Sequence, residues 1–179
     1  MSMNEIILKK AKKIKLIALD IDGVLTEGKL IILNSGEEIK IWNVKDRFAH
    51  TLLNKSGLNI KLAWITARQS DQVAIRASEL KIDYVYQKYI DKLKAINDII
   101  SKEQFKYENI AYIGDDWLDI PALCNCGLSV CPKDAHEEVK KIVDYISKFN
   151  GGKGVFREVV EIILKSHNLY DKILKTYKE

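Results

Sequence analysis

The sequence lacks the features by which secreted, membrane and nucleic-acid-binding proteins are usually recognised. Its first residues, MSMNEIILKKAKK, contain an apolar run of only three residues and no small-residue cleavage site, so they predict neither a signal peptide nor a membrane span. The 29 basic and 25 acidic residues are interspersed, apart from the basic stretch KKAKKIK at residues 9–15. The resulting net charge of +4 argues against nucleic acid as the main partner. We expect a cytoplasmic protein that associates with no membrane.

Cysteine is also scarce. Cys124, Cys126 and Cys131 form the pattern C-x-C-x4-C, and His136 is the nearest candidate for a fourth metal ligand. A structural zinc site usually takes four ligands in closely spaced pairs such as C-x2-C, which this pattern does not provide. We therefore interpret the three cysteines as reduced, small apolar side chains in a reducing compartment, and zinc binding is the less favoured alternative.

The chain has no internal repeat and no low-complexity linker, and it alternates between two kinds of segment. Its 179 residues, 47% of them apolar, suffice for one core, and we expect a single domain over residues 1–179. Apolar runs typical of buried strands alternate with segments of helical periodicity. The strands are expected at residues 15–21, 58–66, 84–87, 109–115 and 128–132, and the helices at 46–56, 70–80, 91–103, 116–125 and 135–143. This alternation predicts an α/β fold with a doubly wound parallel sheet covered by helices on both faces.

One segment, residues 29–44, interrupts this alternation. It reads KLIILNSGEEIKIWNV, in which apolar and polar side chains alternate around Asn34-Ser35-Gly36, and it predicts a β-hairpin that projects from the sheet. We expect its apolar side chains to form one exposed face that a monomer could not easily cover. These side chains are Leu30, Ile32, Ile39 and Ile41.

Two carboxylates stand where the first expected strand gives way to glycine, in LIALDIDGVLTEG at residues 16–28. Strand side chains alternate, so Asp20 and Asp22 leave the strand on the same side. Two like charges about 4 Å apart, at an effective dielectric near 20, repel by roughly 4 kcal/mol. The pair therefore calls for a cation, a shared proton or a reaction.

Polar residues also follow the other expected strands, at the edge where an open parallel sheet binds its ligands. Beyond the acid pair they are Thr66, Arg68, Lys92, Asp115, Asp116 and Asp119. Taken singly, each has an ordinary explanation: a strand-end hydroxyl, a surface salt bridge, a solvated lysine or a helix cap. Taken together with the acid pair upstream, they favour a catalytic site.

Four segments resemble, in this order, the four motifs of the haloacid dehalogenase superfamily of phosphotransferases: DIDGVLT, ITAR, DKL and GDDWLD. Further segments extend the resemblance, over nearly the whole chain, to the 3-deoxy-D-manno-octulosonate 8-phosphate phosphatases. They are IDKLKAI, IAYIGDDWLDIPAL, CGLSVCPKDAH and GGKGVFREV. The resemblance implies a magnesium-dependent hydrolase of a sugar-acid phosphate that works through an aspartyl-phosphate intermediate.

The resemblance also implies roles for individual residues. Asp20 is the nucleophile, and Asp22 protonates the departing sugar alkoxide and then activates the hydrolytic water. Thr66 and Lys92 bind phosphoryl oxygens. The carboxylates of Asp20 and Asp115, with the backbone carbonyl of Asp22, hold Mg²⁺.

Three further residues have supporting roles by the same resemblance. Gly23 allows the backbone to approach closely after the acid pair. Asp116 acts on the metal through water, and Asp119 holds Lys92 in place.

The substrate contacts rest on the resemblance as well. Arg68 matches an arginine that pairs with the carboxylate of the sugar acid or with phosphate, as a bidentate fork does well. Asp46 is a further candidate. Lys153 and Arg157, in the glycine-rich segment at residues 151–158, would reach a site of their own subunit or of a neighbour.

The spacing of the motifs leaves no room for a cap domain. From Asp22 to Thr66 there is space for the hairpin and one helix, and from Thr66 to Lys92 for one helix and one strand. The site nevertheless needs a cover against water. The capless family is generally tetrameric, and hairpins and C-terminal tails of neighbouring subunits complete its sites. We therefore expect a homotetramer, with a C-terminal tail at about residues 165–179.

The chain departs from the family pattern at Arg47, Ala49 and Lys88, where glycine is common. Added bulk and charge near the mouth of the site leave a different acidic sugar phosphate open. The nine-carbon ulosonate 9-phosphate phosphatases are the nearest alternative, although they tend to carry glutamate where Arg68 stands. From other classes, the alternatives are a receiver-like phosphoacceptor signalling domain and a catalytically retired assembly domain. A receiver carries its phosphoacceptor mid-chain and alone at its strand end, which argues against that alternative.

Overall fold

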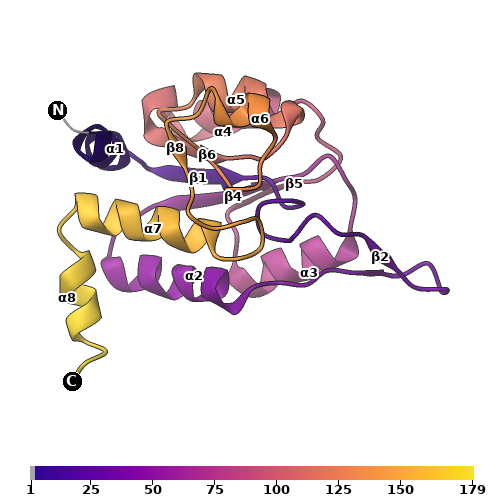
Figure 1. Cartoon of the computed structure of the whole chain (residues 1–179), viewed down its shortest axis with the longest axis horizontal. Helices are drawn as coiled ribbons and strands as arrows, with labels where there is room; N and C mark the ends of the chain where they lie inside the picture. The colour runs from indigo at the N-terminus through magenta and orange to yellow at the C-terminus, as the bar shows by residue number, and fades with distance from the viewer. Residues whose placement is uncertain (1–2) are drawn as a thin grey trace.

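The computed structural model describes residues 3–179 and has a central sheet of six parallel strands between two layers of helices (Figure 1). The strand order is β5-β4-β1-β6-β7-β8. The strands are β1 (Leu16–Leu19), β4 (Lys61–Ile65), β5 (Tyr84–Tyr86), β6 (Ile110–Ile113), β7 (Leu128–Cys131) and β8 (Tyr145–Ile146). This arrangement confirms the predicted α/β fold with a doubly wound parallel sheet.

The first strand, β1, lies in the interior of the sheet. Its residue Leu16 pairs with Lys61 of β4 on one side and with Ile110 of β6 on the other. All four residues of β1 are fully buried, because helices cover both faces. A continuous apolar run is therefore needed here, whereas an alternating pattern would suit a half-exposed strand.

The helices divide between the two faces of the sheet. They are α1 (Met3–Ala11), α2 (Val44–Ser56), α3 (Asp71–Leu80), α4 (Lys92–Glu103), α5 (Ile120–Asn125), α6 (Glu137–Lys140), α7 (Val155–Ser166) and α8 (Tyr170–Lys175). One apolar cluster joins the sheet to α1, α2, α3 and α7, and a second joins it to α4, α5 and α6. Figure 1 shows α4, α5 and α6 on one side of the strands and α2, α3 and α7 on the other.

The predicted hairpin is present as a separate two-stranded antiparallel sheet of β2 (Ile31–Ile32) and β3 (Glu38–Ile39). It projects at one end of the molecule, and α8 lies at the other end (Figure 1). From Asp22 to Thr66 the chain forms this hairpin, α2 and β4, and from Thr66 to Lys92 it forms α3 and β5. The expectation that no cap domain is inserted between these motifs is confirmed.

The prediction of a single apolar face on the hairpin is wrong. The register pairs Ile31 with Ile39 and Ile32 with Glu38, and neighbouring strand residues point to opposite sides. Ile32 and Ile39 therefore lie on opposite faces. One face carries Ile31 and Ile39, which line a shallow hollow together with Ile41. Four consecutive apolar residues, 30–33, concealed this register, because a shift of one residue leaves their pattern unchanged.

Several elements differ from the expected ones. The segment at 116–125 begins as a 3-10 turn, Trp117–Asp119, before α5, and the helix expected at 135–143 is the short α6. The pattern did not reveal α1, α7, α8 or the two-residue strand β8. Within residues 3–179, no helix combines the length and apolar character that crossing a bilayer requires.

Candidate active site

The carboxyl ends of the central strands bring the acidic motifs together. The backbone N–H of Asp20 donates to the carbonyl of Ile113 at 3.0 Å, so the pairing of β1 with β6 continues one residue beyond β1. Asp115 follows β6 two residues after Ile113. Thr66 is held in the same way beyond β4, since its N–H donates to the carbonyl of Tyr86 at 2.8 Å.

Asp20, Asp115 and Asp119 form a compact acidic cluster. Each offers a carboxylate oxygen, and these oxygens lie within 4.8 Å of one another. Burial, followed by the charge of Asp119, raises the pKa of Asp20 to about 6 and the pKa of Asp115 to about 8. Oδ1 of Asp115 is buried and accepts no hydrogen bond from any described residue. A cation at this position would satisfy that oxygen and relieve the repulsion.

The donor set fits a hard divalent cation. It consists of carboxylate oxygens alone, which Mg²⁺ prefers to nitrogen or sulfur ligands. Gly23 leaves the necessary space: its φ is +93°, and a Cβ atom there would lie 2.1 Å from Oδ2 of Asp115. Glycine is therefore required at this position both for the backbone conformation and for the close approach of Asp115.

Lys92 is the cation that the chain itself supplies to the cluster. The cap of α4 by Asp91, whose side chain accepts from the N–H of Lys94 at 3.0 Å, places Lys92 in the first turn of the helix. Its Nζ lies 2.8 Å from Oδ1 of Asp20 and donates to the carbonyl of Ile65 at 2.7 Å. The side chain is fully buried. Such a lysine is a structural part of the site, not a solvated helix residue.

The side chain of Asp119 binds the loop after β6 more closely than it binds Lys92. Its carboxylate accepts from the N–H groups of Asp115 and Asp116 at 3.0 and 3.2 Å and from the hydroxyl of Tyr112 at 2.7 Å. Its distance to Nζ of Lys92 is longer, at 3.8 Å. The exposed Asp116 accepts from the N–H of Trp117 and so caps the 3-10 turn, as the simpler interpretation of this acid predicted.

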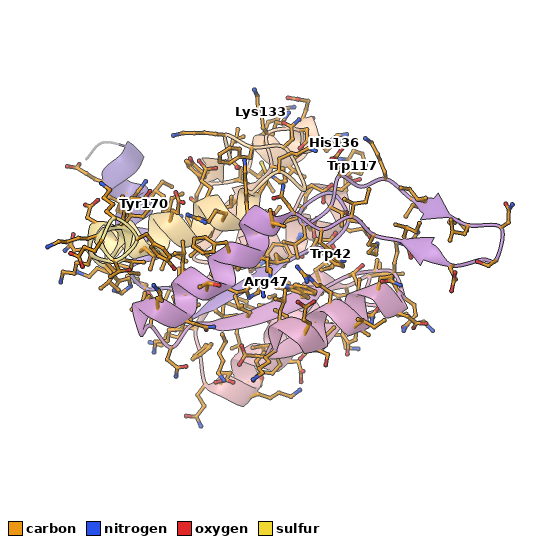
Figure 2. All side chains as sticks on the ribbon, turned by 90° about the horizontal axis from the view of Figure 1, so that it is seen from below. Trp42, Arg47, Trp117, Lys133, His136 and Tyr170 are labelled. Carbon is orange, nitrogen blue, oxygen red and sulfur yellow. The ribbon has the colours of Figure 1, made fainter. Side chains whose placement is uncertain are left out.

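Trp117 and His136 lie together beside this loop, as Figure 2 shows. The indole N–H donates to Nδ1 of His136 at 3.0 Å, and the backbone N–H of His136 donates to the carbonyl of Asp115 at 2.9 Å. Within residues 3–179, no cysteine or histidine belongs to a group with metal-binding geometry. Burial raises the pKa of the Cys126 and Cys131 thiols to about 12 each, so they remain protonated. These observations argue against the zinc alternative.

The hairpin brings two residues to Asp22 that the sequence interpretation missed. Nζ of Lys40 lies 2.5 Å from Oδ1 of Asp22 and 2.9 Å from Oε1 of Glu38. Arg68 lies on the other side of Asp22, with Nε 3.8 Å from Oδ2 of Asp22 and Nη2 3.3 Å from Oε2 of Glu38. The even spacing of Glu38 and Lys40 in the hairpin was the available signal, because it places both on one face.

Asp46, Lys153 and Arg157 are not brought to the acidic cluster within this chain. Asp46 is buried and accepts from the N–H of Arg157 at 2.9 Å at the start of α7; burial raises its pKa to about 6. The guanidinium of Arg157 pairs with Glu161 at 2.7 Å, and Lys153 forms an ion pair with Glu27. A contact of Lys153 or Arg157 with a neighbouring subunit's site stays a prediction.

The three residues that stand where the family commonly has glycine differ in conformation and burial. Lys88 has a φ of +61°, a left-handed conformation that glycine adopts without strain, and its N–H donates to the carbonyl of Arg68 at 3.2 Å. Ala49 is fully buried in the core. Arg47 is exposed beside Trp42 (Figure 2) and lines a small hollow with Trp42 and Trp64.

The loop before α7 closes over the loop after β1. The N–H of Gly152 donates to the carbonyl of Val24 at 2.9 Å, and the side chain of Asn43 donates to the carbonyl of Gly152 at 2.7 Å. A Cβ atom on Gly151 would lie 1.9 Å from the carbonyl oxygen of Gly23. Glycine at 151 is thus needed for the two loops to touch.

Comparison with known proteins identifies the class to which this fold and site belong. The chain matches the family of haloacid dehalogenase-like hydrolases over residues 32–159, and it belongs to that family. The receiver alternative is therefore wrong, and the protein is a phosphomonoesterase.

Within the family, the chain is similar to 3-deoxy-D-manno-octulosonate 8-phosphate phosphatase KdsC. It is 37% identical to that protein of Escherichia coli (strain K12) over 166 residues, which cover 93% of this chain and 87% of the relative. The structure of the phosphatase of that name from Moraxella catarrhalis, in complex with a magnesium ion, a phosphate ion and a KDO molecule, superimposes with a TM-score of 0.93. That structure is 39% identical, and the match covers 98% of this chain and 99% of the other. A cobalt-bound phosphatase from Haemophilus influenzae gives a TM-score of 0.85 at 35% identity over 90% of this chain and 93% of the other.

Proposed function

We propose that the protein hydrolyses 3-deoxy-D-manno-octulosonate 8-phosphate to the free sugar acid and phosphate, with Mg²⁺ as cofactor. The observation that carries the proposal is the acidic cluster with the buried Lys92 at the carboxyl edge of β1 and β6. It is supported by the similarity to a structure that contains magnesium, phosphate and KDO. Arg68 beside Asp22 favours this sugar over the nine-carbon alternative.

Asp20 is the proposed nucleophile. Its Oδ1 accepts from Nζ of Lys92 at 2.8 Å and from the N–H of Ile21 at 2.7 Å, and these two bonds fix the orientation of the carboxylate. The carboxylate attacks phosphorus, the bond from phosphorus to the sugar oxygen breaks, and an aspartyl-phosphate forms. Lys92 neutralises charge on the phosphoryl oxygens, and Lys92 and the hydroxyl of Thr66 orient them by hydrogen bonds.

Asp22 is the proposed proton carrier. It gives a proton to the departing sugar oxygen in the first step, and in the second step it takes a proton from the water that attacks the phosphoenzyme. Asp20, Asp115 and the backbone carbonyl of Asp22 would hold Mg²⁺, which supplies charge neutralisation for the phosphate dianion. Gly23 keeps Asp115 close, and Asp116 and Asp119 hold the loop that carries it.

We further propose that Arg68 binds the carboxylate of the sugar acid and that the protein acts in the cytoplasm as a homotetramer. Both faces of the hairpin expose isoleucine side chains, Ile32 on one and Ile39 on the other, which a neighbouring subunit would cover. Lys153 and Arg157, whose side chains pair with Glu27 and Glu161 in their own chain, are the proposed contacts with a neighbour's site. Sedimentation of an active, stable monomer would contradict the tetramer.

A phosphate-release screen tests the proposed function. Sugar phosphates are incubated with the protein and Mg²⁺, and the wild type is compared with Asp20→Asn and with the matched control Asp98→Asn. Asp98 is half-buried on α4, where its carboxylate accepts from the hydroxyl of Tyr86 and pairs with Lys102 at 2.6 Å, away from the acidic cluster. We expect the eight-carbon ulosonate phosphate to rank first, Asp20→Asn to abolish turnover and Asp98→Asn to preserve it. Activity that survives removal of the metal by a chelator would refute the mechanism.

A further inference from the structure

We propose that Lys40 is a positioning residue that anchors Asp22 for proton transfer, and that Glu38 holds Lys40 in place. The inference rests on the proposed phosphomonoesterase function. It makes the acid and base steps depend on two residues of the hairpin, an element outside the central sheet.

The burial of Lys40 is the first observation. Its side chain is only 2% exposed, whereas Lys29, at the opposite end of the same hairpin segment, is 76% exposed. An ammonium group removed from water must be paired to be tolerated, and Lys40 has two carboxylate partners, Asp22 and Glu38. The lysine is therefore fixed between an acid of the hairpin and an acid of the site.

The unequal surroundings of the two oxygens of Asp22 are the second observation. Oδ1 accepts from Lys40, whereas Oδ2 is buried and accepts no hydrogen bond from any described residue. Nε of Arg68, 3.8 Å away, is also buried without a hydrogen-bond acceptor in this part of the chain. A carboxylate held through one oxygen keeps the other oxygen in a defined place and available to carry a proton.

The consequence for the first step follows directly. When the bond between phosphorus and the sugar oxygen breaks, the proton on Asp22 moves to that oxygen, and Asp22 becomes a carboxylate next to the Lys40 ammonium. Without Lys40, the side chain of Asp22 can rotate away from the leaving oxygen. General acid catalysis contributes about 10²- to 10⁴-fold to such reactions, so loss of orientation should remove a large part of it.

The test compares two leaving groups. A sugar phosphate releases a basic alkoxide that needs a proton, whereas p-nitrophenyl phosphate releases a phenolate that does not. The observable is kcat/KM, because it reports the steps up to release of the first product. For Lys40→Met we expect a fall of about 30-fold or more with the sugar phosphate and a fall below about threefold with the aryl phosphate. Lys29→Met is the matched control and should keep both values.

Two more variants separate positioning from folding. Lys40→Arg, which retains the cation, should recover part of the lost sugar-phosphate activity. Glu38→Gln should show the same selective loss to a smaller degree, because it loosens Lys40 without removing it. Circular dichroism should give the spectrum of the wild type for every variant used.

The outcomes distinguish this inference from the proposed function. Equal losses with both leaving groups would mean that Lys40 attracts the phosphate or supports the fold, and would overturn the inference alone. Unchanged kcat/KM in Lys40→Met would overturn it as well. A wild type that hydrolyses neither substrate would overturn the proposed function and the inference together.

Discussion

Affinity for Mg²⁺ should rise steeply between pH 6 and pH 8. In the proposed site the metal binds Asp20 and Asp115 as carboxylates, and the folded protein raises the pKa of Asp20 to about 6 and that of Asp115 to about 8. Protons therefore compete with the metal in a range where ordinary aspartates are already ionised.

The size of the effect follows from the two pKa values. At pH 6 about half of Asp20 and about one hundredth of Asp115 are ionised; at pH 8 nearly all of Asp20 and about half of Asp115 are ionised. The fraction of molecules with both groups ionised rises about 100-fold, which corresponds to about 2.7 kcal/mol. At pH 7, binding should release about one proton, mostly from Asp115.

Isothermal titration calorimetry with Mg²⁺ at pH 6, 7 and 8 measures this dependence, and buffers of different ionisation enthalpy report the protons released. The stability of the metal-free protein should change in the opposite direction. Because Asp115 binds its proton more tightly in the folded protein than in the unfolded chain, the free energy of unfolding should fall as the pH rises from about 4 to about 8. Added Mg²⁺ should restore most of the loss at pH 8.

A dissociation constant for Mg²⁺ that does not change between pH 6 and pH 8 would refute this reasoning. Release of no proton at pH 7 would refute it too. Asp115→Asn provides the internal check, because it removes the group with the higher pKa and should leave weak Mg²⁺ binding with a much shallower pH dependence.

Three further predictions follow from buried groups. Gly23→Ala should weaken Mg²⁺ binding at least about tenfold in calorimetry, since its Cβ would lie 2.1 Å from Oδ2 of Asp115. Gly36→Ala is the control, because Gly36 has a φ of +87° but no atom within 4 Å of the added Cβ. It should lose only about 1 kcal/mol of stability and keep the Mg²⁺ affinity of the wild type. Burial lowers the pKa of His50 to about 4, so the unfolded chain binds its proton first, and the contribution of His50 to the free energy of unfolding should fall by about 3 kcal/mol as the pH falls from 6.5 to 4. Urea unfolding should therefore show His50→Gln gaining stability relative to the wild type over this range, and a constant difference between the two proteins would contradict the assignment. Lys92→Met should abolish turnover. It should also lower the free energy of unfolding of the metal-free protein by about 3 kcal/mol, because it leaves buried carboxylates unpaired. A Lys92→Met variant with the kcat of the wild type would disprove the catalytic role of Lys92.

The sheet and the place of the site could be predicted from the sequence because both depend on strong, local signals. Strands buried on both faces must be continuously apolar, as in residues 16–19 and 110–113. Polar residues directly after such strands must meet at one edge of a parallel sheet. The proximity of Asp20, Asp115 and Lys92 follows from those two rules and from the position of α4.

The remaining features depend on contacts between distant residues that no local pattern encodes. Asp46 lies in the first turn of α2, yet its partner is the backbone at the start of α7. The contact of Lys40 with Asp22 requires the register of the hairpin, which its run of four apolar residues conceals. Helices α1 and α8 carry no motif, and β8 is too short for a detectable period.

The contact of Gly151 and Gly152 with the loop after β1 has a consequence for folding during synthesis on the ribosome. The acid pair leaves the ribosome well before Gly151 and Gly152, which close over its loop. Until Gly152 has emerged, the nascent chain carries two neighbouring aspartates without the loop that packs against them, and β1 also waits for β6. We therefore expect ribosome-bound chains that end before residue 152 to be inactive, with phosphatase activity appearing abruptly once the chain extends beyond this segment.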